Sequence, residues 1–303
     1  MKKILSSILL LLAAIIWGFA FVAQKAAESV PPFTIGALRS IFAGIFLIFV
    51  IMLFDRVKND GRRLFSKEKP IDFNRYELIG GVICGVVLAA ASFFQQAGIN
   101  NGTSAGKASF ITALYVVLVP IYALFLKKRA RLNVWISIAT SVVGFYLLCI
   151  NGEFGIVASD ILVIAASLIF PIHILAIDRY SPICDGVRMS CIQFFTCAIV
   201  NTVFALIFEL PLNTGAVIDA ILPLVFLGIG SSGIAYTLQI VGQKGVNPSA
   251  ASLILSMESV FGVIGSAIIL SERMTEREYI GCAVVLGSVI LSQLEFSPRK
   301  RVK

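Results

Sequence analysis

The sequence predicts an all-α membrane protein with ten transmembrane helices in two inverted five-helix repeats. Its 303 residues are 58% hydrophobic and 14% charged, a composition outside the range of ordinary soluble domains. The apolar residues form runs of about 20 positions, the length that a helix needs to cross a hydrocarbon layer about 30 Å thick. The predicted spans are 4–23, 33–54, 76–98, 103–126 and 131–150 in the first repeat (residues 1–150), and 158–178, 187–208, 219–240, 249–270 and 277–294 in the second (residues 151–303).

The first apolar run is interpreted as a membrane helix rather than as a cleaved signal peptide. From Ile4 to Ala23 it exceeds the 7–15 residues of a signal-peptide core, and no convincing small-x-small cleavage site follows. Residues 55–75 form one sizeable hydrophilic loop. No soluble catalytic domain is therefore expected, and the chain is not expected to be an enzyme.

The positions of the basic residues predict the orientation in the membrane. If the N-terminus is cytoplasmic, 20 of the 25 Lys and Arg residues fall at cytoplasmic ends of the predicted spans. Such an excess favours an even number of spans with both termini in the cytoplasm of a plasma (inner) membrane protein.

Charge and cysteine patterns exclude several other classes of protein. The net charge of +8 comes from segment ends rather than from an aromatic-interleaved basic patch, so no nucleic-acid partner is expected. The six cysteines form no CxxC pair and mostly lie inside apolar runs, which is typical of small buried residues; neither a metal site nor a cofactor is expected.

Residues 228–233 (GIGSSG) match two catalytic or binding motifs that the context argues against. As GxGxxG they lie inside an apolar helix with no preceding strand, which favours helix packing over dinucleotide binding. As GxSG they resemble the nucleophile motif of intramembrane serine proteases, which need a general base. His173 is the one histidine and lies upstream, whereas the protease order places it downstream. An intramembrane protease is therefore a remote alternative.

A weak internal repeat supports the division into two halves. A shift of 143 positions aligns Gln96 with Gln239, and Ala108-Ser109 with Ala251-Ser252. In both places a helix ends near a glutamine, turns through a short glycine-containing link and enters a helix rich in small residues. Because each half has an odd number of spans, the second half is expected to be inverted relative to the first, as in many alternating-access transporters.

The span 249–270 holds an acidic residue, Glu258, near the middle of the membrane. A charged carboxylate at that depth costs at least a few kcal/mol unless it faces protein or water. Helical projection places Glu258 on a side rich in serine and glycine, and assigns the remaining third to lipid. Asn247-Pro248 fits an N-cap followed by a first-turn proline. The expected lipid-facing residues are Leu253, Ile254, Met257, Val260, Phe261, Ile264 and Ile268.

The other polar residues inside the spans are candidates for the substrate site, each with a structural alternative. Glu258 is either a coupling or substrate-contact group or a structural hydrogen-bonding residue. His173 is either a proton relay or a satisfied structural histidine. Arg39 clamps a substrate carboxylate, extends outward to the interface or pairs with Glu28. Cavity lining or interhelix hydrogen bonding explains the remaining candidates: Trp17, Gln95, Gln96, Ser109, Tyr115, Tyr236, Gln239 and Ser252.

Three segments resemble the drug/metabolite transporter superfamily, EamA type. They are Trp17–Lys25 with the later Pro31-Pro32 and Leu38-Arg39, then Gly106–Pro120, and Asn247–Arg273. The resemblance implies ten helices in two inverted repeats, cytoplasmic termini and transport of small organic solutes such as amino acids and metabolites. Lys127-Lys128-Arg129 departs from the Gly-Glu pair that many relatives carry there, so the resemblance says little about the substrate.

We therefore expect a secondary transporter of small organic solutes that works by alternating access, with one repeat rocking against the other. The expected direction of transport is efflux, and this expectation rests on the family analogy alone. The expected partners are a small-molecule solute, the lipid bilayer and, as a candidate coupling ion, the proton; the oligomeric state is left open. The alternatives are a membrane channel and a scaffold that transports nothing.

Overall fold

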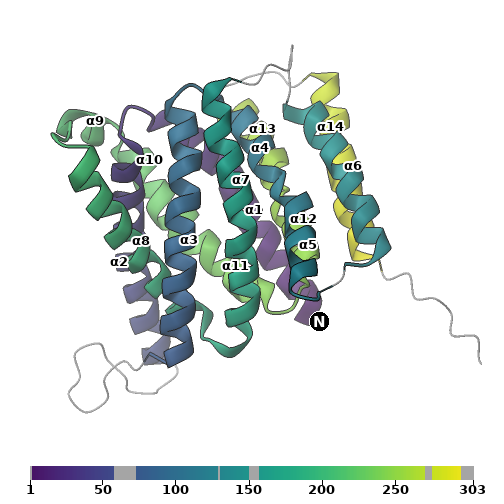
Figure 1. Ribbon diagram of the computed structural model, residues 1–303, viewed down its shortest axis with the longest axis horizontal. Coiled ribbons are helices and arrows are strands. Elements are labelled where there is room, and N and C mark those ends of the chain that lie inside the picture. Colours follow the sequence, from purple (N-terminus) through teal and green to yellow (C-terminus); the bar gives the residue numbers. More distant parts are fainter. Residues whose placement is uncertain (1, 58–72, 129, 150–156, 270–274, 295–303) are drawn as a thin grey trace, which may run out of the picture.

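The computed structural model describes residues 2–57, 73–128, 130–149, 157–269 and 275–294, and helices joined by short turns make up these ranges (Figure 1). Most of the helices run roughly side by side along one common direction, and the N-terminal helix is tilted across it. In chain order they are α1 (Lys2–Ala26), α2 (Pro32–Val57), α3 (Arg75–Asn100), α4 (Ala105–Ala113), α5 (Tyr115–Phe125), α6 (Leu132–Cys149), α7 (Ala158–Tyr180), η1 (Ser181–Ile183), α8 (Gly186–Phe208), α9 (Thr214–Asp219), α10 (Ile221–Val225), η2 (Phe226–Ala235), α11 (Tyr236–Gln243), α12 (Pro248–Leu255), α13 (Glu258–Ile269) and α14 (Glu276–Gln293).

The all-helical membrane fold expected from the sequence is confirmed. Eight helical segments of the described chain are long and apolar enough to cross a membrane. The expected fifth and tenth spans correspond to the shorter helices α6 and α14, of 18 residues each, which pack against each other. The total of ten spans therefore stays a prediction.

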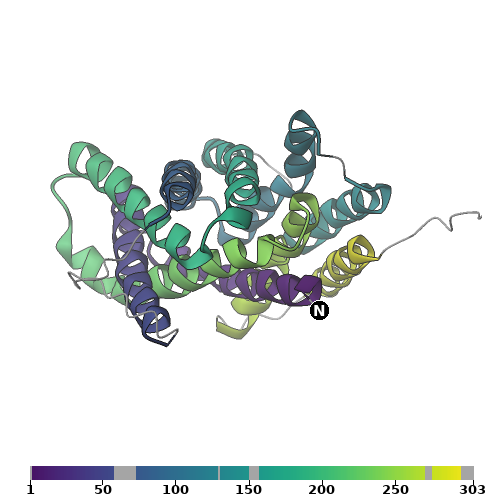
Figure 2. The same ribbon diagram turned by 90° about the horizontal axis from the view of Figure 1, so that it is seen from below.

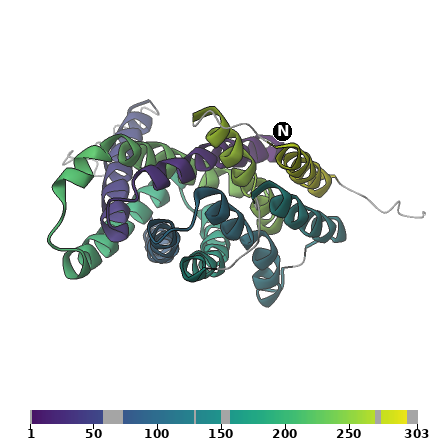
Figure 3. The same cartoon turned by 90° about the horizontal axis from the view of Figure 1, so that it is seen from above.

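Helices of the two sequence halves are interleaved. The most extensive contacts each join a first-half helix to a second-half helix: α3 with α7, α6 with α14, and α2 with α8. Seen from either end, α6 and α14 lie together at one edge of an elongated bundle, while α2 and α8 lie at the other (Figures 2 and 3). α1 runs through the middle and packs against α13.

Two of the expected spans are broken near their middle. The fourth is divided into α4 and α5 at Leu114, and the ninth into α12 and α13 at Ser256-Met257. Tight i→i+3 hydrogen bonds replace the regular pattern there, from the Leu114 amide to Ile111 and from the Met257 amide to Ile254. No proline or glycine stands at either break, so the sequence pattern predicts continuous helices.

The two broken helices cross in opposite directions. α4 contacts α13, and α5 contacts α12, as antiparallel helices require. The second segment of each begins at Tyr115 or Glu258, and these positions are 143 residues apart, like the repeat found in the sequence. The breaks therefore face each other at the centre of the molecule.

The eighth expected span is also irregular, because its central ten residues, Phe226–Ala235, form the wider-wound π-helix η2. Its glycines bring it close to α2: a Cβ at Gly228 would lie 2.5 Å from the Cβ of Phe42, and one at Gly233 would lie 2.8 Å from the Phe46 ring. The GxGxxG match thus lies at a helix-packing surface. π-helical segments often occur at functional sites.

The prediction of which residues of the ninth span face lipid is mostly wrong. Leu253, Ile254, Met257 and Val260 are buried, whereas Ile268 is exposed. α12 and α13 pack against helices on several sides, including α1, α4, α5 and α14. Because lipid and neighbouring helices are equally apolar, helical projection cannot tell which of them covers such a face.

Candidate functional site

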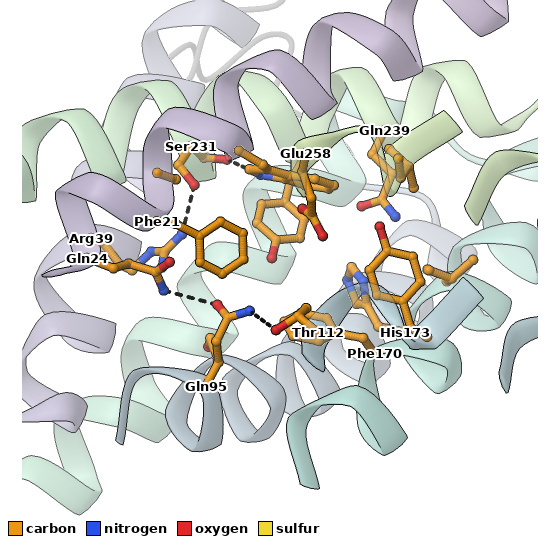
Figure 4. Close-up of a pocket in the computed structure, with 17 residues that line it drawn as sticks. Phe21, Gln24, Arg39, Gln95, Thr112, Phe170, His173, Ser231, Gln239 and Glu258 are labelled. Atoms are coloured by element: carbon orange, nitrogen blue, oxygen red, sulfur yellow. Dashed lines mark hydrogen bonds between the residues drawn. The ribbon is translucent and has the colours of Figure 1, made fainter. Parts of the chain in front are cut away.

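A polar pocket lies at the centre of the bundle, where the broken helices meet (Figure 4). Its empty volume is about 540 Å³, part of which opens to solvent. Residues from both halves of the sequence line it. They are Trp17, Ala20, Phe21, Gln24, Arg39, Ser92, Gln95, Thr112, Tyr115, Phe170, His173, Ile174, Ser231, Tyr236, Gln239, Leu255 and Glu258.

Arg39 brings a positive charge to one end of this pocket. Its side chain is 7% exposed. Nε donates to Ser232 Oγ at 2.9 Å and Nη2 to Ser231 Oγ at 3.0 Å, so η2 holds the guanidinium in place. No carboxylate of the described residues forms an ion pair with it. The alternative of pairing with Glu28 is wrong, because Glu28 binds Lys25 instead.

Trp17 and Tyr236 form one wall of the pocket. Their ring centroids are 4.6 Å apart, and the indole Nε1 donates to the backbone oxygen of Ser231 at 3.2 Å. These contacts tie α1 to η2 and α11 beside Arg39.

A chain of amides joins three helices on another side of the pocket. Gln24 Nε2 donates to Gln95 Oε1, and Gln95 Nε2 donates to Thr112 Oγ1, both at 3.0 Å (Figure 4). Gln24 and Thr112 are absent from the sequence-based site. Gln24 lies inside the Trp17–Lys25 segment that carries the family resemblance, and its position as a polar residue in this mainly apolar segment is the signal that could have identified it.

Glu258 lies on the opposite side of the pocket from Arg39 (Figure 4). The side chain is 5% exposed, and the Tyr115 hydroxyl lies close enough to its carboxyl group to interact. Glu258 Oε1, Tyr115 Oη and Gln239 Oε1 are all buried and make no well-formed hydrogen bond within the described part of the chain. A carboxyl group is thus directed into the cavity rather than toward lipid.

His173 is hydrogen-bonded to Gln193, a residue that is not among the predicted site residues. Its Nε2 lies 3.0 Å from Gln193 Oε1, and its ring packs edge-on against Tyr236 with centroids 5.7 Å apart. The ring also lines the pocket.

Three predicted site residues lie outside the pocket lining. Gln96 Nε2 donates to Gln24 O and Asn100 Oδ1, which supports α1 and α3. Ser109 Oγ and Ser259 Oγ are 2.9 Å apart where α4 crosses α13. Ser252 Oγ donates to Ser249 O within α12. Their contacts are those of helix packing.

The first turns of α12 and α4 interact with side chains of the protein itself. Asn247 accepts from the Ser249 amide and precedes Pro248 at the first turn of α12, which confirms the expected cap. At the start of α4, Asp160 accepts from Thr103 Oγ1 at 3.0 Å and forms an ion pair with Lys107. The anion beside this helix start is therefore a side chain of α7, bound to Thr103 and Lys107.

Comparison with known proteins identifies the family. The model of the EamA-like transporter family matches residues 4–150 and 157–294. An uncharacterized transporter of Archaeoglobus fulgidus is 29% identical over 97% of this chain and 87% of its own length. The uncharacterized transporter YoaV of Bacillus subtilis is 22% identical over 94% of this chain and 96% of its own length.

The fold is also found in a solved structure. One crystal structure superposes with a TM-score of 0.73 at 19% identity and covers 95% of this chain and 96% of that chain. At this identity the likeness shows the fold alone. Together with the family match, which covers most of the sequence, and the apolar helices, it leads to one conclusion. The chain belongs to the EamA-like transporter family, and it is a multi-pass membrane transporter rather than an enzyme.

Proposed function

We propose that this transporter exports small organic solutes of the amino-acid or metabolite type by alternating access. One observation carries the proposal: a central polar pocket, where two broken antiparallel helices cross, holds Arg39 and Glu258 without an ion-pair partner for either among the described residues. Polar and ionisable groups at membrane depth are expensive and typically mark a substrate or ion pathway. The efflux direction rests on family analogy.

Arg39 is proposed to bind an anionic group of the solute. Among the described residues, the hydrogen-bond partners of this buried guanidinium are two serine hydroxyls, which compensate poorly for its lost hydration. Its planar array of N–H donors matches a carboxylate, which supports the clamp considered from the sequence.

Glu258 is proposed to couple transport to protons. Its carboxyl group faces Tyr115 and Gln239, and it shares the pocket with Tyr236, His173 and the more distant Arg39. A proton bound there removes the negative charge from the interior, and solute exchange then occurs against that proton.

The inverted five-helix arrangement is part of the proposal, with residues 1–150 and 151–303 as its two repeats. The antiparallel crossing of the broken helices and the 143-residue offset of their breaks support it. Rotation of one whole half against the other would separate the extensive α3–α7, α2–α8 and α6–α14 contacts. We therefore propose that access alternates mainly by bending of the two broken helices at Leu114 and Met257.

We propose that the transporter lies in the inner membrane with both termini in the cytoplasm. The distribution of Lys and Arg supports this orientation. A reporter that is active only in the cytoplasm, fused after Lys303, tests it. Activity of a periplasmic reporter at the same site would contradict the orientation.

Transport in proteoliposomes with and without a pH gradient tests the coupling. We expect solute flux to respond to the gradient in the natural protein and in Glu276→Gln, which alters an exposed carboxylate of α14. We expect Glu258→Gln to lose this response. A Glu258→Gln protein that folds, binds solute and keeps the same pH dependence would refute the coupling role.

The same flux measurement separates the alternative functions. A channel would give flux far above carrier turnover and no counter-transport. A scaffold would give no flux for any solute.

A further inference from the structure

We infer that Glu258, Tyr115 and Gln239 form a subsite for a primary ammonium group. The inference rests on the proposed transport function and names a chemical class for the solute. Each of the three side chains contributes one buried oxygen that makes no well-formed hydrogen bond in the described chain: Glu258 Oε1, Tyr115 Oη, which lies close to the Glu258 carboxyl group, and Gln239 Oε1. The side chains are 5%, 4% and 2% exposed, and all three line the central pocket.

The three oxygens come from separate elements that meet at this point. Glu258 is the first residue of α13, Tyr115 is the first residue of α5, and Gln239 lies in α11. Tyr115 lies beside the Glu258 carboxyl group. Figure 4 shows the Glu258 and Gln239 side chains extending into the same part of the cavity, away from Arg39.

Neighbouring hydrogen bonds fix which end of the Gln239 amide faces the pocket. Gln243 Nε2 donates to the backbone oxygen of Ile174 at 2.6 Å, so Gln243 Oε1 is left as the acceptor. Gln239 Nε2 donates to that oxygen at 3.5 Å. The remaining atom of the Gln239 amide, Oε1, is therefore an acceptor that needs a donor.

The chemistry of three clustered acceptors selects the ligand. A primary ammonium group carries three N–H donors and one positive charge. Glu258 supplies both an acceptor and the compensating negative charge, while the amide and the phenol supply neutral acceptors. A neutral alcohol offers one donor, and a quaternary ammonium ion offers none. The site therefore favours R–NH₃⁺ over molecules of similar size that lack these donors.

The same subsite gives a physical basis for proton exchange. The Glu258 carboxyl group binds one positive charge at a time, either a proton or the ammonium group. When the ammonium group enters, the proton leaves, and the reverse exchange occurs when the solute departs. A solute that also carries an anion presents it to Arg39 at the other side of the pocket.

Ligand-induced thermal stabilisation of the purified full-length protein tests the subsite. The probes are 2-phenylethylamine and L-phenylalanine, because Trp17, Phe21 and Phe170 line the same cavity. Each is compared with its N,N,N-trimethyl derivative, which keeps the positive charge but has no N–H donor, and 2-phenylethanol serves as the neutral analogue. We expect a primary amine to bind at least about tenfold more tightly than its trimethyl counterpart, since each hydrogen bond that involves a charged group is worth about a factor of ten.

Conservative variants link the preference to these oxygens. Tyr115→Phe and Gln239→Leu are expected to reduce the preference for the primary amine about tenfold each. Tyr146→Phe on α6 and Gln96→Leu on α3 are the matched controls outside the pocket, and both should retain it.

Three results would overturn the ammonium assignment: equal binding of the primary and trimethyl forms, no stabilisation by either primary amine, or an unchanged preference in folded Tyr115→Phe and Gln239→Leu. Stabilisation by NaCl but not by choline chloride, without any amine, would assign the oxygens to an inorganic cation instead. If amines fail while other solutes are transported, the proposed transport function stands and the subsite is wrong. If amines bind but no solute is transported, the subsite stands and the transport function is wrong.

Discussion

Substituting Gly18 is expected to separate the two helices that position Trp17 and Glu258. Gly18 in α1 meets α13 almost backbone to backbone. A Cβ at Gly18 would lie 2.5 Å from the Cβ of Phe261 and 2.7 Å from the amide nitrogen of Gly262, whereas ordinary contacts begin at 3.4 Å. In Gly18→Ala, α1 and α13 must therefore move apart by about 1 Å.

The expected cost follows from the kind of atoms in contact. Backbone atoms cannot move aside as the end of a flexible side chain can, so the substitution should cost about 1–3 kcal/mol, the usual range for overpacking. The shift also widens the pocket between Trp17 and Glu258, so transport should fall even in protein that folds.

The assay is the midpoint of thermal unfolding of purified protein, followed by transport in proteoliposomes. Gly287→Ala on α14 is the matched control, because a Cβ at that glycine meets nothing within 4 Å. The control should be neutral or slightly more stable, since alanine is the better helix former. Equal stability and equal transport of the two variants would refute the close-contact reasoning.

Two further predictions concern contacts that join α2 to α8. Glu209→Gln should lower the unfolding free energy by about 1–2 kcal/mol, because both Glu209 oxygens accept hydrogen bonds at the start of α2. The control Glu276→Gln should leave the thermal midpoint unchanged. An equally unchanged midpoint for Glu209→Gln would contradict the prediction. Arg188→Met should be more destabilising than Asp55→Leu combined with Arg188→Met, by about 1 kcal/mol or more, because the single change leaves a buried carboxylate without its partner. The thermal midpoints of the single and the double variant measure this difference. A lower midpoint for the double variant would show that the ion pair is effectively solvated.

The helical class and most of the element positions followed from hydrophobicity alone. Apolar runs of membrane length are detected by counting residues, and their ends are marked by basic residues and by caps such as Asn247-Pro248. Glu258 was identifiable for the same reason, since a carboxylate inside an apolar run is rare.

Eight of the eleven predicted site residues line the pocket, and the reason that three do not is geometric. Gln96, Ser109 and Ser252 lie on polar helix faces as expected, but those faces meet other helices or their own backbone. A polar face indicates that a helix is not turned to lipid; it does not indicate whether a cavity or a neighbouring helix lies opposite.

The sequence by itself determined a bundle of apolar helices and the unusual acid within one of them, and it indicated, through weak matches, a repeat at a shift of 143 positions. Only the tertiary structure decided that Tyr115 and Glu258 begin the second segments of two broken helices, that η2 winds as a π-helix to hold Arg39, and that Gln24 and Thr112 join the pocket. The physical reason is that helix breaks without proline or glycine, and contacts between side chains of different helices, are set by packing between helices. Hydrophobic periodicity along one helix carries no record of that packing.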